Sequence, residues 1–185
     1  TNYVVATEPL SAAQWDSIGW SGREGLSDAR VQFMYLRRSA DGRIVAGGES
    51  APYFYDSMPS TGNYRPSIEK LKRSLLMTFP QLEGVRFTNE WGGTMAFTRD
   101  FVPSVGRLDG AQNIFYAVGF NGEGVVMTQL AGMILARLVA GDQDALTKLP
   151  IVDKPMPYLG PEPLRSVGVR LYEWALEALG TNPVR

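Results

Sequence analysis

Apolar positions in the first hundred residues recur mainly with the period of β-strands. Residues 3–8 (YVVATE) are short and rich in β-branched side chains, which predicts a strand. Residues 31–48 (VQFMYLRRSADGRIVAGG) hold two apolar runs joined by an Asp-Gly pair, the strongest short signal of a hairpin turn. Residues 85–98 (VRFTNEWGGTMAFT) predict a further strand, interrupted by two glycines. Together these patterns predict a largely antiparallel sheet.

Helical spacing alternates with these strands and dominates the end of the chain. Residues 11–18 predict a short helix with Ser11 as its N-cap. After Pro66, apolar side chains recur at helical intervals as far as Phe79. A last amphipathic helix is expected over 164–179. The connecting segments 51–65 and 150–163 are rich in proline and other loop residues, so the first reads as a loop and the second as an extended stretch.

An unusual pattern follows in residues 113–141, where a short apolar strand (114–118) leads through GFNGEGVV into an apolar helix (125–140). Glycines at 119, 122 and 124 permit positive φ and close backbone approach, and a helix start offers unpaired N–H groups at a positive dipole end. Such a turn favours a partner that carries negative charge. GxxGxG is not the GxGxxG fingerprint, and a tight turn without a ligand explains it equally well. The helix falls short of the roughly 20 apolar residues of a membrane span, so a buried core helix is expected.

Composition narrows the chemistry. The 185 residues are 44% hydrophobic and 20% charged, with a net charge of -1, which suits a soluble globular chain and favours neither nucleic acid nor membrane as a partner. The sequence contains no cysteine or histidine, which rules out disulfides, Cys/His zinc sites and a Ser-His-Asp triad within this chain. We predict no catalytic or metal-ligating residue. The lack of cysteine suits a cytoplasmic protein. The chain begins abruptly in a predicted strand, so a longer protein is expected.

Three segments in fixed order give the chain a family resemblance. They are YLRRSADGRIVAGG (35–48), WGGTMAFTRDFVPSVGR (91–107) and NIFYAVGFNGEGVV (113–126). The second is similar to the pattern W-x-G-x-R-P-x-T-x-D-x-x-P-x-[IV]-G. The chain thus resembles the FAD-dependent amine and amino-acid oxidases of the D-amino-acid oxidase and glycine oxidase superfamily, and most of all their γ-glutamylputrescine oxidoreductase-like members.

The resemblance implies an α+β fold: a mixed, largely antiparallel sheet of a substrate domain flanked by helices, plus the last strand and helix of a FAD-binding α/β domain. It implies a substrate-binding domain over 1–110, the last strand, glycine turn and helix of the FAD-binding domain over 111–141, and an extended segment with a C-terminal helix over 142–185. The family's opening FAD-binding unit has no counterpart here. A missing N-terminal half, or a second chain that supplies it, is therefore an expected partner, and this chain alone is expected to be inactive.

The resemblance also implies that FAD is the cofactor and that the glycine turn lies against its ring. The expected cofactor-binding residues lie in that turn and in the loop around the double glycine. They are Gly92, Gly93, Gly119, Phe120, Asn121, Gly122, Glu123, Gly124 and Val125.

Departures from the family pattern suggest the substrate. The arginine that holds an amino-acid carboxylate aligns with Met95, and a second family arginine aligns with Gly122, beside Glu123. Without a bidentate clamp an α-carboxylate would be buried unpaired. We therefore expect hydride transfer to FAD from a small amine without an α-carboxylate, of the polyamine or γ-glutamyl-polyamine type. Met95 and Glu123 are expected to contact it, with Glu123 facing a distant ammonium; a simple role at the helix dipole is equally compatible.

For several other residues, the sequence allows either a functional or a structural role. Tyr35 aligns with a substrate-contacting tyrosine, although strand packing also explains it. Arg65 or Arg99 could supply a displaced clamp. Trp91 is expected in the core, and Asp100 is expected to fix its loop by hydrogen bonding. The alternative function, from another class, is a non-catalytic module that binds amines or a partner subunit without flavin.

Overall fold

The computed structural model describes residues 1–30, 33–53, 55, 63–111 and 113–179. The start of the expected hairpin at 31–32 and most of the expected loop over 51–65 lie outside these ranges. The chain divides by its contacts into two compact units. Unit 1 comprises Thr1–Thr94 with Pro161–Arg185, and unit 2 comprises Met95–Gly160.

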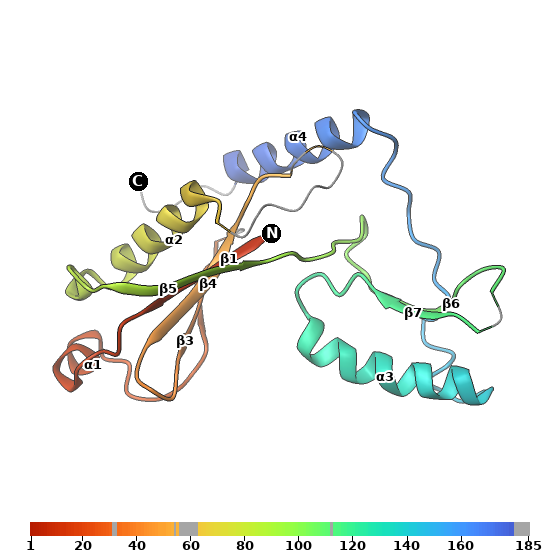
Figure 1. The fold of residues 1–185 in the computed structure, drawn as a ribbon, viewed down its shortest axis with the longest axis horizontal. Coiled ribbons are helices and arrows are strands. Elements are labelled where there is room, and N and C mark those ends of the chain that lie inside the picture. Colours follow the sequence, from red (N-terminus) through yellow and green to blue (C-terminus); the bar gives the residue numbers. More distant parts are fainter. Residues whose placement is uncertain (31–32, 54, 56–62, 112, 180–185) are drawn as a thin grey trace. The chain divides into compact units, whose positions relative to one another are not determined.

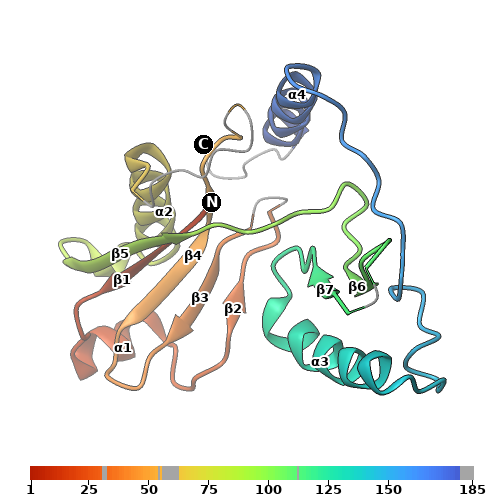
Figure 2. The same ribbon diagram turned by 45° about the vertical axis from the view of Figure 1, so that its right-hand side comes forward.

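Unit 1 is built on a five-stranded antiparallel sheet in the order β2-β3-β4-β1-β5, which Figure 2 shows as a twisted ribbon. Its strands are β1 (Asn2–Thr7), β2 (Leu26–Ser27), β3 (Tyr35–Arg38), β4 (Ile44–Ser50) and β5 (Phe87–Gly93). The predicted strand and hairpin are confirmed. The strand expected over 85–98 is not interrupted at its glycines but ends there, because β1 begins at Asn2 and Asn2 pairs with Gly93.

Helices flank this sheet. They are α1 (Ala12–Ile18), α2 (Arg65–Thr78), the 3-10 turn η2 (Pro80–Leu82) and α4 (Leu164–Leu179). Ser11 and Gln14 form a capping box that starts α1, as the sequence predicted for Ser11. In Figure 1, α2 runs along the sheet, and it buries Ile68, Leu71 and Leu75 in a core that includes Tyr3. The helical periodicity after Pro66 therefore marks a core-facing stripe.

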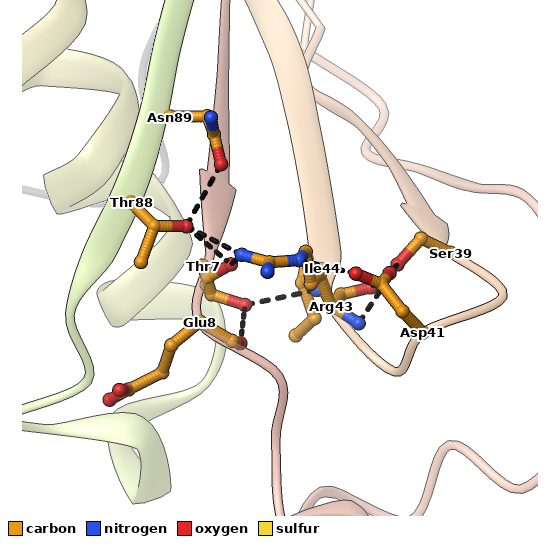
Figure 3. Close-up of polar contacts among 8 residues, drawn as sticks. All are labelled: Thr7, Glu8, Ser39, Asp41, Arg43, Ile44, Thr88 and Asn89. Carbon is orange, nitrogen blue, oxygen red and sulfur yellow. Dashed lines mark hydrogen bonds and ion pairs between the residues drawn. The ribbon is translucent and has the colours of Figure 1, made fainter.

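A polar cluster links the turn of the hairpin to β1 and to the edge strand β5 (Figure 3). Arg43 donates through Nη1 to the Thr7 carbonyl at 3.0 Å and to the Thr88 hydroxyl at 2.6 Å, and its Nε lies 2.6 Å from an oxygen of Asp41. The Ser39 hydroxyl donates to the other Asp41 oxygen at 2.5 Å. One guanidinium thus joins the turn to both β1 and β5.

Unit 2 is smaller. It contains the antiparallel pair β6 (Ser104–Arg107) and β7 (Phe115–Val118), followed by α3 (Gly124–Ala140). The core consists of Val105, Ala131 and Ile134. Residues 151–153 run parallel to β6, since Val105 donates its N–H to the Ile151 carbonyl and accepts from the N–H of Asp153, both at 2.9 Å. The proline-rich stretch is otherwise without helix or strand as far as residue 163, as predicted.

Two burial predictions are wrong. Only Ala131 and Ile134 are buried in α3, and Val125 is 93% exposed, because unit 2 offers just one hairpin and a short segment to cover the helix. Trp91 is not in the core but is 45% exposed at the end of β5. The mixed α+β class with a largely antiparallel sheet is confirmed. Within the described ranges, no helix combines the length and apolar character needed to cross a membrane.

Candidate functional site

The glycine turn between β7 and α3 takes its shape from three residues with positive φ. Gly119, Asn121 and Gly122 have φ values of 71°, 52° and 100°. Glycine adopts this region freely, and asparagine is among the few other residues that tolerate it. The N–H of Glu123 donates to the Phe120 carbonyl at 2.8 Å and closes the turn just before α3 begins. The backbone therefore accounts for glycine at 119 and 122, but not at 124, which begins α3.

The Asn121 side chain joins this turn to the motif segment of residues 91–107. Its Oδ1 accepts the N–H of Thr98 at 2.9 Å, and its Nδ2 donates to the Gly119 carbonyl. A Cβ on Gly119 would lie 2.3 Å from Thr98 Cγ2, so Gly119 must lack a side chain for the two segments to meet. Sequence reasoning missed this link. An asparagine flanked by glycines in a turn was the available signal, because asparagine both tolerates positive φ and bonds nearby backbone.

The start of α3 is open. Glu123 occupies the N-cap position without a side-chain hydrogen bond to the helix. A Cβ added at Gly122 or at Gly124 would meet nothing within 4 Å, and Val126 is 71% exposed. The first N–H groups of a helix lack intrahelical partners, and here they stand at an accessible, positive dipole end. This geometry fits the electron-rich edge of a planar ring, which could approach the backbone where side chains are absent.

Glu123 itself is exposed. A carboxylate at the start of a helix interacts favourably with the dipole. Because this interaction needs no ligand, it is enough to explain a glutamate at position 123. The exposed carboxylate also remains accessible to a cationic group.

The loop that carries Met95 is held by its own polar contacts. Asp100 accepts the Val102 N–H at 3.3 Å and lies 2.5 Å from the Lys154 ammonium, and the hydrogen bond from Lys154 holds the pKa of Asp100 below its ordinary value. The prediction that Asp100 fixes its loop is confirmed. Arg99 is exposed and donates to the Tyr158 carbonyl at 3.5 Å, while Met95 is half-buried. The structure therefore places Met95 in the same unit as the glycine turn, three residues before the Thr98 that bonds Asn121.

The remaining predicted site residues belong to unit 1. Tyr35 on β3 lies opposite Gly47 on β4, and a Cβ on Gly47 would stand 2.2 Å from the phenol oxygen, so the ring lies across this glycine. Burial raises the pKa of the Tyr35 phenol. A Cβ on Gly92 would stand 2.8 Å from the ring of Tyr3, whereas Gly93 has open space. Close packing on Tyr3 is thus a sufficient reason for glycine at 92.

Arg65 is engaged in unit 1. Its guanidinium pairs with Glu69 and Glu90, and the hydrogen bond that it donates to Glu90 raises the pKa of Arg65. Lys72 reaches the same two carboxylates at 3.0 and 2.5 Å. A guanidinium held by two carboxylates is poorly placed to act as a clamp for a third, so Arg65 reads as part of an ion-pair network between α2 and β5.

Comparison with known proteins gives consistent matches. The family described as "FAD dependent oxidoreductase" (DAO) matches residues 1–138. The probable oxidoreductase OrdL of Haemophilus influenzae is 30% identical over 176 residues, which are 94% of this chain and 38% of that protein. The γ-glutamylputrescine oxidoreductase of Escherichia coli is 37% identical over 128 residues, which are 68% of this chain and 28% of that protein.

The structural comparison agrees at the level of fold. The crystal structure of glycine oxidase from Geobacillus kaustophilus matches 85% of this chain and 39% of that one, with a TM-score of 0.64 and 18% identity. The chain spans well under half the length of each of these relatives.

Proposed function

Because this chain belongs to the family of FAD dependent oxidoreductases, whose pattern covers residues 1–138, we propose that it is the C-terminal part of a flavin-dependent amine oxidoreductase. Bound FAD would supply the oxidant, taking a hydride from the carbon beside the amine nitrogen and leaving an imine and a proton. The observation that carries the proposal is the open start of α3 behind a turn of three positive-φ residues.

In this proposal the chain contributes preorganised backbone donors. The turn Gly119–Val125 would line the ring edge that gains negative charge on reduction, with the unpaired N–H groups at the start of α3 as the donors. Gly93 remains a proposed cofactor-binding residue. Fixed donors aimed at developing charge stabilise it without reorganisation. Gly92 keeps its proposed place beside the cofactor, although its packing on Tyr3 already explains the residue type.

The proposed substrate is a small amine without an α-carboxylate, of the polyamine or γ-glutamyl-polyamine type. Met95 stands where a carboxylate clamp would be needed, and the nearby Arg99 is exposed and bonded to a carbonyl. Glu123 offers an exposed carboxylate for a distant ammonium, and a neutral, half-buried Tyr35 offers a hydroxyl. The name of the Escherichia coli relative points to the same substrate class.

The proposal assigns residues 1–110 to substrate binding, 111–141 to the end of the FAD-binding domain, and 142–185 to a C-terminal extension. The remaining FAD-binding part would be supplied by preceding residues or by a second chain. We refer to the 185 residues together with that part as the assembled protein. Its cytoplasmic location stays a prediction.

Stopped-flow spectroscopy of the assembled protein under anaerobic conditions tests the proposal. The flavin absorbance should bleach faster with putrescine or γ-glutamylputrescine than with glycine or D-alanine. The reverse order would show that another group clamps a carboxylate, and the substrate assignment would fall. An assembled protein that purifies colourless and takes up no FAD would instead favour a binding module without flavin.

A further inference from the structure

Helix α4 carries an apolar stripe that the described residues of unit 1 leave exposed. The stripe consists of Leu164, Val167, Leu171 and Trp174, whose exposed fractions are 70%, 55%, 61% and 68%. Steps of three and four residues place these side chains on one face of the helix. The helix lies beyond the 138 residues that the family pattern covers, so the pattern itself assigns it no role.

The opposite side of α4 is the side that is held. Glu173, nine positions and thus about two and a half turns after Leu164, accepts the backbone N–H of Tyr53 at 3.0 Å. Before the helix, Glu162 accepts the N–H of Ser166 at 3.1 Å and its hydroxyl at 2.5 Å, and Nε of Arg165 at 3.0 Å. Glu173 therefore ties the helix to the segment at Tyr53, Glu162 caps its first turn, and the side chains of the apolar stripe stay exposed. A solvent-facing helix normally shows the reverse arrangement.

We propose that the apolar stripe of α4 packs against the FAD-binding part of the assembled protein, an inference that rests on the proposed function. The length of the relatives supports this occupant. The match to the Haemophilus influenzae protein takes in 94% of this chain but only 38% of that protein, which leaves a large additional part to be packed. An apolar helix face beside a domain of that size becomes part of an interior.

The position of Thr1 supports the same occupant. Thr1 is half-buried. Ala51, two residues before the Tyr53 that Glu173 holds, donates its N–H to the Thr1 carbonyl at 2.8 Å. Any residues that precede Thr1 in a chain of the relatives' length would therefore enter unit 1 beside this helix.

Other occupants fit less well. Helices that lie on anionic membranes carry many lysines and arginines on the polar face, whereas α4 has only Arg165 and Arg170, and Arg165 is bound to Glu162. A stable contact between two copies buries about 800 Å² on each side. Four side chains on one helix are a small basis for that area. They suit a local contact within a larger interface.

Thiol labelling can test this because the 185 residues contain no cysteine. We would introduce Leu171→Cys in the stripe and, as a matched control, Tyr172→Cys, whose native side chain is 53% exposed but lies about 100° around the helix. In the assembled protein, site-resolved labelling should be at least about tenfold slower at 171 than at 172, after each rate is normalised to urea-unfolded protein. A benzophenone maleimide on the thiol at 171 should then cross-link to residues outside the 185.

The outcomes separate the alternatives. Equal labelling rates at the two sites would overturn the inference. So would protection at 171 that disappears on dilution, which indicates a second copy, or protection that requires phosphatidylglycerol vesicles. The visible spectrum of the same samples distinguishes failure of the docking inference from failure of the proposed flavin-dependent function. A yellow protein with a reactive stripe refutes only the docking, and a colourless protein with a protected stripe refutes only the flavin assignment.

Discussion

Gly124→Ala should stabilise the fold and weaken the cofactor complex, two effects of opposite sign from one methyl group. Gly124 begins α3 with an ordinary helical backbone, and a Cβ there would meet nothing within 4 Å. Because glycine is the less favourable helix residue, alanine should raise the free energy of unfolding by up to about 0.5–1 kcal/mol. For a turn that binds nothing, no further effect is expected.

If the proposed cofactor binds at this turn, Gly124→Ala should have a second effect, on cofactor affinity. Where backbone N–H groups contact a ring edge directly, a new methyl group pushes the ring away and lengthens the hydrogen bonds at that edge. Loss of one hydrogen bond to a charged group costs about 1.5–3 kcal/mol. FAD should therefore bind about ten- to a hundredfold more weakly to the Gly124→Ala variant.

Two titrations check both halves on the assembled protein: urea unfolding of the apoprotein, and FAD binding followed by flavin fluorescence. Gly132→Ala is the matched control, since this glycine also has no atom within 4 Å of a built Cβ and lies in α3, eight residues and thus about 12 Å further along. It should give a comparable gain in stability with unchanged FAD affinity. Wild-type FAD affinity in Gly124→Ala would refute the reasoning that places the ring at the start of α3.

Three further changes test neighbouring parts of the account. Asn121→Gly keeps the positive φ but removes the bonds to Thr98 and Gly119, so urea unfolding should show a loss of about 1–3 kcal/mol; an unchanged midpoint would show that these bonds do not hold the turn. Met95→Arg restores a carboxylate clamp and should raise the rate of flavin reduction by glycine relative to putrescine, whereas an unchanged ratio would place the substrate elsewhere. Hydrogen bonds led by that of the Ser166 hydroxyl lower the pKa of Glu162 from 4.5 to about 2, so its stabilising effect is complete above pH 4.5 and disappears as pH falls toward 2. Between pH 4.5 and 2, the midpoint temperature of thermal unfolding, followed by circular dichroism, should fall less steeply in Glu162→Gln than in the wild type. Parallel plots of this temperature against pH would contradict the pKa shift.

Local signals in the sequence sufficed for the elements of unit 1. The Asp-Gly pair, the Ser11 cap and the helical spacing after Pro66 each act through a few neighbouring residues, and each lies where it was expected. Strand ends depend on the partner strand instead. The sequence of residues 85–98 does not show that strand pairing stops at Gly93, because the end of β5 is set by its partner Asn2 on β1.

Burial was harder to predict, for a related reason. An apolar pattern shows that a face avoids water but not whether the same chain covers it. The helix over 124–140 and Trp91 look like core residues, yet Val125 and Trp91 are exposed in the chain by itself. The glycines show the same limit. Gly119 and Gly92 are required by Thr98 and Tyr3, contacts distant in sequence, whereas Gly122 and Gly124 have open space around them.

Site-resolved amide hydrogen exchange of the assembled protein, with and without FAD, tests the central claim most directly. The account predicts that the backbone amides of Gly124, Val125 and Val126, which begin α3 without helical partners, exchange quickly in the apoprotein and become protected when FAD binds. Amides in the last turn of α3 should change little. Protection that appears elsewhere while these three amides continue to exchange quickly would contradict the placement of the flavin ring at this turn.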